Sequence, residues 1–183
     1  MKSNNKLNNF PPVYYISLEE SEDRQKKLIH NFHVNGISNY HGLISKRFAE
    51  SGIHLNGTSQ WSMKSTTKGA VTAHITNIKK WIDSGEGDIG FFCEDDISFS
   101  TVKHWNFNWS DFVDRLPEDW EAVQLMWVRP GIGVIELRER FPDDWSATAF
   151  IIKREYGQKI VSEYYVNDNE FTIELHEEKP TVE

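Results

Sequence analysis

Three consecutive carboxylates, Glu94, Asp95 and Asp96, directly follow the apolar run 90–93. A buried strand cannot keep unpaired charges inside the protein, so the triplet predicts the point where such a strand reaches the surface. In open α/β sheets this end of a strand is where ligands bind. Adjacent carboxylates repel one another, and a hard cation such as Mg²⁺ or Mn²⁺ would stabilise them while also binding phosphate oxygens. We therefore expect a metal site here; the alternative is a solvated acidic turn.

The overall charge favours the same interpretation. The chain has 183 residues and a formal net charge of −8, with no block of Lys or Arg. This argues against nucleic acid or an anionic membrane surface as the main partner. An anionic substrate would also be repelled unless a bound cation reversed the local charge. The single cysteine, Cys93, excludes a disulfide framework and a thiolate zinc cluster, and we expect it to be a small buried side chain.

The length predicts one domain over residues 1–183, with a polar head at 1–10. The charged end around 177–180 leaves open a truncation or a missing second domain. No segment approaches the roughly 20 apolar residues that span a bilayer, and the first residues lack the apolar part of a secretory signal. We expect a cytoplasmic protein with no transmembrane segment.

Predicted strands and helices alternate along the chain, which indicates an α/β fold with a mostly parallel sheet. Residues 40–65 are expected to be a loop with short ordered pieces, and 134–137 to form a hairpin arm. The strands are expected at 13–18, 89–93, 122–127 and 145–152, and the helices at 21–33, from 67–70 through 84, at 109–116 and at 154–165.

Four blocks in this order resemble glycosyltransferase family 25, the lipopolysaccharide-biosynthesis type that includes bacterial and collagen β-galactosyltransferases. They are 13–18 with the following Asp23 and Arg24, then 68–74, 91–96 and 147–154. Two features depart from the family pattern. Ala73 stands where the family usually has Ser, and the chain ends where the family continues with further acidic and donor-site residues.

The resemblance implies a GT-A fold with a Rossmann-type sheet flanked by helices. It also implies a nucleoside-diphosphate sugar donor, UDP-galactose by default, a glycan or glycolipid acceptor, Mn²⁺ or Mg²⁺, and inversion at the anomeric carbon. By comparison with other GT-A enzymes, Asp96 is the expected metal ligand, helped by Glu94, and Glu94 or Asp95 would contact the donor. Asp95 has a second interpretation, in which it points into the fold and caps a neighbouring loop.

Further donor contacts are expected at the ends of the first strand and around the second helix. Arg24 would grip a phosphate, or else form a surface pair with Asp23. The backbones of Ser17 and Leu18 would line a nucleobase pocket. Lys68 precedes the second helix, whose N-terminal N–H groups would accept phosphate charge, although a solvated lysine is the commoner role.

His74 lies on an otherwise apolar helical face, where a buried core histidine is the usual interpretation; the resemblance gives it a donor-site role as well. An inverting transfer needs a carboxylate within hydrogen-bond reach of the acceptor hydroxyl. Asp143 and Asp144 are the candidates for this base, with an ordinary Pro-Asp turn as the alternative.

The leading hypothesis is a metal-dependent inverting glycosyltransferase. The alternative is a degenerate, non-catalytic transferase domain that binds a glycan or a partner, which the residue at Ala73 and the short C-terminus favour. A metal-dependent phosphoesterase is a third possibility, but it would need more metal ligands than the sequence offers in a convincing set.

Overall fold

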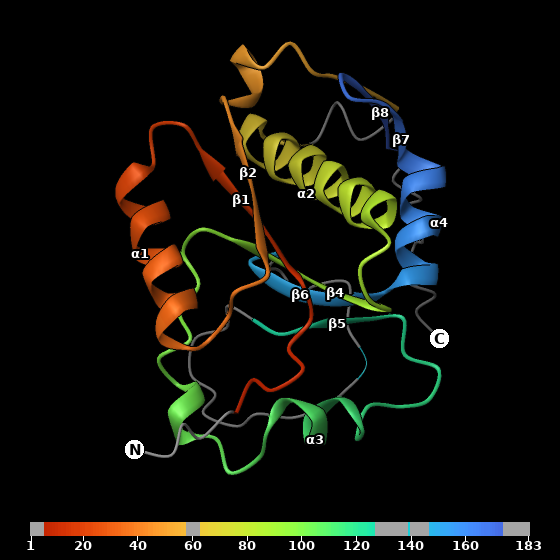
Figure 1. Ribbon diagram of the computed structural model, residues 1–183. Coiled ribbons are helices and arrows are strands. Elements are labelled where there is room, and N and C mark those ends of the chain that lie inside the picture. Colours follow the sequence, from red (N-terminus) through yellow and green to blue (C-terminus); the bar gives the residue numbers. More distant parts are fainter. Residues whose placement is uncertain (1–5, 58–62, 127–138, 140–146, 174–183) are drawn as a thin grey trace, which may run out of the picture.

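The computed structural model describes residues 6–57, 63–126, 139 and 147–173, which form an α/β fold (Figure 1). Within these residues, a five-stranded sheet has the order β2-β1-β4-β6-β5 and a smaller sheet has the order β3-β8-β7. The large sheet carries the predicted acidic triplet at the end of one of its central strands.

The first three elements form a parallel unit of strand, helix and strand. β1 (Val13–Leu18) leads through α1 (Glu22–Val34) into β2 (Tyr40–Ser45), and β2 pairs in parallel with β1. The predicted strand and helix are confirmed. β2 corrects the expectation of a loop over 40–65. It is an edge strand in which no residue is fully buried and half are exposed, so it lacks the apolar run of a buried strand.

The second helix and strand also agree with the prediction. α2 (Ser65–Ser84) ends at Gly85, which has a left-handed backbone with φ of 71°. β4 (Ile89–Glu94) follows and pairs in parallel with β1. α2 begins before the residues that were expected to lead into it.

The sheet is mixed with a parallel core, so the expectation of a mostly parallel sheet is confirmed in part. β6 (Ala149–Lys153) pairs antiparallel with β4 on one side and with β5 (Ala122–Gln124) on the other. Only the β2-β1-β4 part consists of parallel pairs. An apolar run indicates that a strand is buried but not which way it runs. Both strands are shorter than predicted; residues 127, 134–137 and 145–146 lie outside the described part.

The remaining elements are short. The predicted third helix is confirmed as α3 (Trp109–Val113) and the last as α4 (Arg154–Tyr164). The small sheet was not anticipated, since its strands are only three residues long. It contains β3 (His54–Asn56), β7 (Tyr165–Asn167) and β8 (Glu170–Thr172), and two single-turn helices are η1 (Phe48–Glu50) and η3 (Val102–His104).

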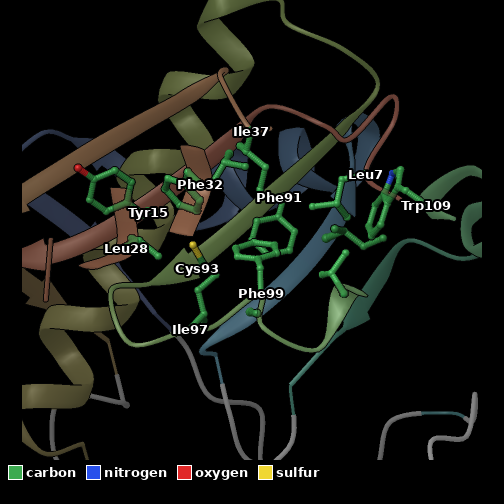
Figure 2. Close-up of a cluster of buried hydrophobic side chains, with 14 of the residues drawn as sticks. Leu7, Tyr15, Leu28, Phe32, Ile37, Phe91, Cys93, Ile97, Phe99 and Trp109 are labelled. Carbon is green, nitrogen blue, oxygen red and sulfur yellow. The ribbon is translucent and has the colours of Figure 1, made fainter. Parts of the chain in front are cut away.

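Alternate residues of the central strands face opposite helices. Val13 and Tyr15 pack in one cluster with Leu28 and Phe32 of α1 (Figure 2). On the other face, Tyr14 of β1 packs in a second cluster with buried residues of α2, β4 and β6: Ile78, Trp81, Phe92 and Ile152. α1 and α2 therefore cover opposite faces of the sheet. β2 lies on one side of β1 and β4 lies on the other, so the strand order reverses at β1. The carboxyl ends of β1 and β4 form a topological switch point, the usual ligand position in such sheets.

Two expectations about individual residues are settled by the core. Cys93 is fully buried, as predicted. The polar head is not uniformly solvated, because Leu7 is buried and Phe10 packs against Phe91, with ring centroids 5.0 Å apart. No helix in the described ranges has both the length and the apolar character needed to cross a membrane.

Candidate functional site

The candidate site begins where β1 and β4 end side by side. Asp95, the first residue after β4, accepts a 2.6 Å hydrogen bond at Oδ2 from Oγ of Ser17 near the end of β1. Both residues are buried. This bond ties the two strands together at the switch point. It places the acidic triplet at the carboxyl edge of the sheet, as the sequence predicted.

Arg24 lies in the first turn of α1 and contacts two carboxylates. Its Nη2 pairs with Oδ1 of Asp95 and lies 3.1 Å from Oδ2 of Asp96. The Asp95 side chain is only 6% exposed, whereas that of Asp96 is 52% exposed. Asp95 therefore points into the fold, the alternative that the sequence left open, and it holds Arg24 in place. Asp96 is the carboxylate that reaches solvent.

The arginine was expected to bind a phosphate or to pair with its neighbour Asp23, and the structure gives it different partners. Its guanidinium neutralises part of the acidic triplet that was expected to need a metal. Arg24 is nevertheless about half exposed, so it lies at the surface of the site rather than inside it. A phosphate approaching Asp96 would meet this cation.

Glu94 is half-buried at the end of β4, opposite Ile16 of β1. Its pKa is raised above the ordinary value by burial, and further by the charges of Asp96 and Asp95, while Arg24 lowers it. The repulsion among the three acids is therefore only partly relieved by Arg24. A divalent cation close to Glu94 and Asp96 would relieve it further.

These residues fit a metal site of only one kind. Within the described residues, no group of three or more His, Cys, Asp or Glu side chains is arranged to hold a metal ion. Asp96 and Glu94 fit a cation that takes one or two protein carboxylates and completes its shell with phosphate oxygens and water, as Mg²⁺ commonly does. Asp95 is already occupied by Ser17 and Arg24.

Lys68 does not precede α2, as was expected, but lies within its first turns. Its backbone N–H donates to the carbonyl of Lys64 at 3.0 Å and is thus already bonded. The helix begins at Ser65, the last residue of the expected loop, and includes the residues 67–70 that were expected to lead into it. A phosphate contact from the backbone N–H of Lys68 is therefore excluded in this conformation.

His74 matches the interpretation as a buried core histidine. It is 5% exposed and lies edge-on to the ring of Phe150, with centroids 5.1 Å apart. Burial lowers its pKa to about 4, and the backbone of Ala147 opposes this shift. Neither ring nitrogen has a hydrogen-bond partner within the described residues. The imidazole is therefore uncharged at neutral pH.

A cleft of about 310 Å³ lies on the α2-facing side of β2. It was not predicted, since half of its wall comes from the segment that was expected to be a loop. Ala73 is part of this wall. The lining residues are Leu43, Ser45, Lys46, Phe48, Ser51, Ile53, Gly69, Thr72, Ala73, Thr76, Lys80 and Asp168.

The other predicted site residues have mixed outcomes. Leu18 ends β1 beside Ser45, so its backbone lies at the sheet edge, as expected. Asp143 and Asp144 lie outside the described residues, and their role as a general base stays a prediction.

No family model matches the chain, and no curated protein shows significant similarity to it. The likeness to glycosyltransferase family 25 therefore depends on the four sequence blocks.

Proposed function

We propose that the protein is a metal-dependent glycosyltransferase that uses a nucleoside-diphosphate sugar. The observation that supports this most is the position of Glu94 and Asp96 at the carboxyl end of β4, beside the switch point of a Rossmann-like sheet. Ligands of α/β folds bind at such a position, and the four sequence blocks give the ligand its chemical class.

Each residue of the site has a separate task in this proposal. Asp96 and Glu94 would hold Mn²⁺ or Mg²⁺, which supplies Lewis-acid stabilisation to a diphosphate leaving group. Arg24 lies 3.1 Å from Asp96 and would add a second positive charge on the same side. Asp95 and Ser17 act as positioning residues, since they fix Arg24 and the strand ends but are buried.

The remaining parts of the proposal come from the resemblance alone. They are galactose from UDP as the default donor, a hydroxyl of a glycan or lipopolysaccharide-like molecule as acceptor, and inversion at the anomeric carbon. Asp143 or Asp144 would take the proton from the acceptor hydroxyl. A nearby carboxylate is required for that step whichever acceptor is used.

The direct test is a thermal-shift panel of UDP, UDP-galactose and other nucleotide sugars, with and without Mn²⁺, followed by a transfer assay. Stabilisation by a ligand grows with its concentration relative to its Kd. UDP is expected to raise the Tm only when Mn²⁺ is present, and Asp96→Asn should abolish this shift and the transfer. Asp119→Asn serves as the control, because it removes an exposed carboxylate from the turn between α3 and β5, which is distant in sequence from the acidic triplet. A panel without any shift would contradict the proposal.

One observation favours a second candidate, a non-catalytic domain that binds a glycan or a partner. Arg24 already pairs with both Asp95 and Asp96 and offsets part of their charge, so the triplet can persist without a metal. Nucleotide binding without transfer to any acceptor, or glycan binding that Asp96→Asn leaves unchanged, would support this candidate over the first.

A further inference from the structure

The cleft between α2 and β2 has the features of a ligand site that is separate from the acidic triplet. Its volume of about 310 Å³ lies at the lower end of the range for small-molecule sites, enough for one ring with a substituent. One wall is a stripe along α2 in which Gly69, Ala73 and Thr76 follow one another at helical spacing. The opposite wall comes from the end of β2 and from η1.

The hydroxyl groups of the cleft are left as hydrogen-bond acceptors. Thr72 donates its hydroxyl proton to the carbonyl of Lys68 at 2.9 Å, and Thr76 donates to the carbonyl of Thr72 at 2.9 Å. Ser51 likewise donates to the carbonyl of Phe48 at 2.8 Å, and one of its two lone pairs already accepts from the backbone N–H of Ile53 at 3.1 Å. A hydroxyl has one proton and two lone pairs, so each group keeps accepting capacity. Such a wall suits a ligand that carries several O–H donors.

The charges of the cleft are unusual for this protein. Lys46 and Lys80 both line it, and the described residues give neither of them an ion pair. Asp168 is the one carboxylate of the lining, and it already accepts a 2.5 Å hydrogen bond from the hydroxyl of Tyr165. Two lysines therefore line one cleft in a chain with a net charge of −8. An anionic group of a ligand would complement them.

The floor of the cleft is apolar, with Leu43, Phe48 and Ile53 among its residues. The C–H face of a sugar ring would pack on this floor, with hydroxyls at its edge. We propose that the cleft binds a phosphorylated sugar, with the phosphate at Lys46 and Lys80 and a ring hydroxyl donating to the half-buried Thr76 of α2. This inference goes beyond the proposed function, because it requires neither a metal nor a transfer reaction.

Two classes of ligand carry a phosphate on a sugar: a nucleotide, which has a ribose phosphate, and a free hexose phosphate. The register of the sheet relates the cleft to the acidic triplet. Leu43, which lines the cleft, lies opposite Ile16 of β1, and Glu94 of the triplet lies opposite the same Ile16 on β4, so two strand spacings separate them by roughly 10 Å. A nucleotide is long enough to span this distance, whereas a hexose phosphate would stay within the cleft.

The test is a binding titration by NMR or calorimetry with EDTA present, which removes any metal-dependent binding at Asp96. The probes are UMP and glucose 6-phosphate, each with its uncharged counterpart, uridine and glucose. Lys46→Gln and Lys80→Gln are each expected to weaken binding of the phosphate probe about five-fold, and the double variant more than ten-fold. Lys27→Gln makes the same charge change on the exposed side of α1 and should leave binding unchanged. Thr76→Val keeps the shape of the side chain but removes its hydroxyl, and it should weaken binding by a few-fold.

The outcomes separate this inference from the proposed function. Binding that Asp96→Asn leaves intact but the double lysine variant loses supports the cleft, whether or not any transfer occurs. Preference for UMP or for glucose 6-phosphate identifies the source of the phosphate. Failure of both probes to saturate, or equal weakening by the lysine double variant and by Lys27→Gln, would overturn the inference. So would equal affinity for the phosphorylated and uncharged probes.

Discussion

The two neighbouring aspartates of the acidic triplet are expected to differ sharply in their contribution to stability. Asp95 is buried and bonded to both Ser17 and Arg24, whereas Asp96 is half exposed and contacts only Arg24 among its described partners. A hydrogen bond to a charged group contributes about 1.5–3 kcal/mol. The contact with Arg24 adds less than about 1 kcal/mol, because the guanidinium is half exposed.

Removal of the Asp95 carboxylate also relieves some repulsion with its acidic neighbours, which offsets part of the loss. We expect Asp95→Ala to lower the free energy of unfolding by about 2 kcal/mol, and Asp96→Ala by no more than about 0.5 kcal/mol. Urea denaturation measures both values. With a slope near 2 kcal/mol/M, the midpoint of Asp95→Ala would fall by about 1 M.

Equal losses for the two variants, or a larger loss for Asp96→Ala, would refute this assignment of roles. A double-mutant cycle between Ser17→Ala and Asp95→Ala isolates the bond that joins the strand ends. A coupling energy of about 1 kcal/mol is expected for this pair, and a value near zero would show that the 2.6 Å contact does not stabilise the switch point.

Two further predictions follow from the core. Burial lowers the pKa of His74 to about 4, below the value of about 6.5 in an unfolded chain, so the unfolded state binds the proton first and stability falls as the pH drops from 6.5 to 4. Urea denaturation should show wild type losing about 3 kcal/mol more than His74→Leu between pH 7 and pH 4, and parallel pH profiles would contradict this. Ala usually stabilises a helix relative to Gly by about 1 kcal/mol. At Gly157, however, a Cβ would lie 2.9 Å from the Trp81 ring, so Gly157→Ala should lower the Tm. Gly69→Ala, whose Cβ would meet Phe48 at an ordinary 3.4 Å, should raise it; a stabilised Gly157→Ala would show that the packing of α4 on α2 adapts.

The elements that hold the candidate site were predictable because they are buried. β1 and β4 have apolar runs, and glycines after α1 and α2 adopt left-handed conformations that end the helices, with Gly36 at φ of 73° and Gly85 at 71°. β2 was missed because an edge strand with an exposed face has no such run. Its Gly42 looked like a loop residue, but a Cβ there would lie 2.5 Å from the ring of Tyr15.

The acidic triplet was located correctly, yet its partners were not. Ser17 lies 78 positions from Asp95 in the chain, and sequence periodicity carries no information on such a pair. The same limit applies to the cleft, whose wall combines α2 with residues after β2 and in the turn between β7 and β8. The direction of β6 also depends on its neighbours rather than on its own residues.

The place of β6 in the large sheet has a consequence for synthesis on the ribosome. β5 precedes β6 in the chain, but among the described strands it pairs with β6 alone, which separates it from β4. While residues up to 148 are emerging, β4 has an open edge and β5 has no strand to pair with. Completion of the sheet therefore waits for Ala149–Lys153, and the nascent chain exposes an aggregation-prone edge until then.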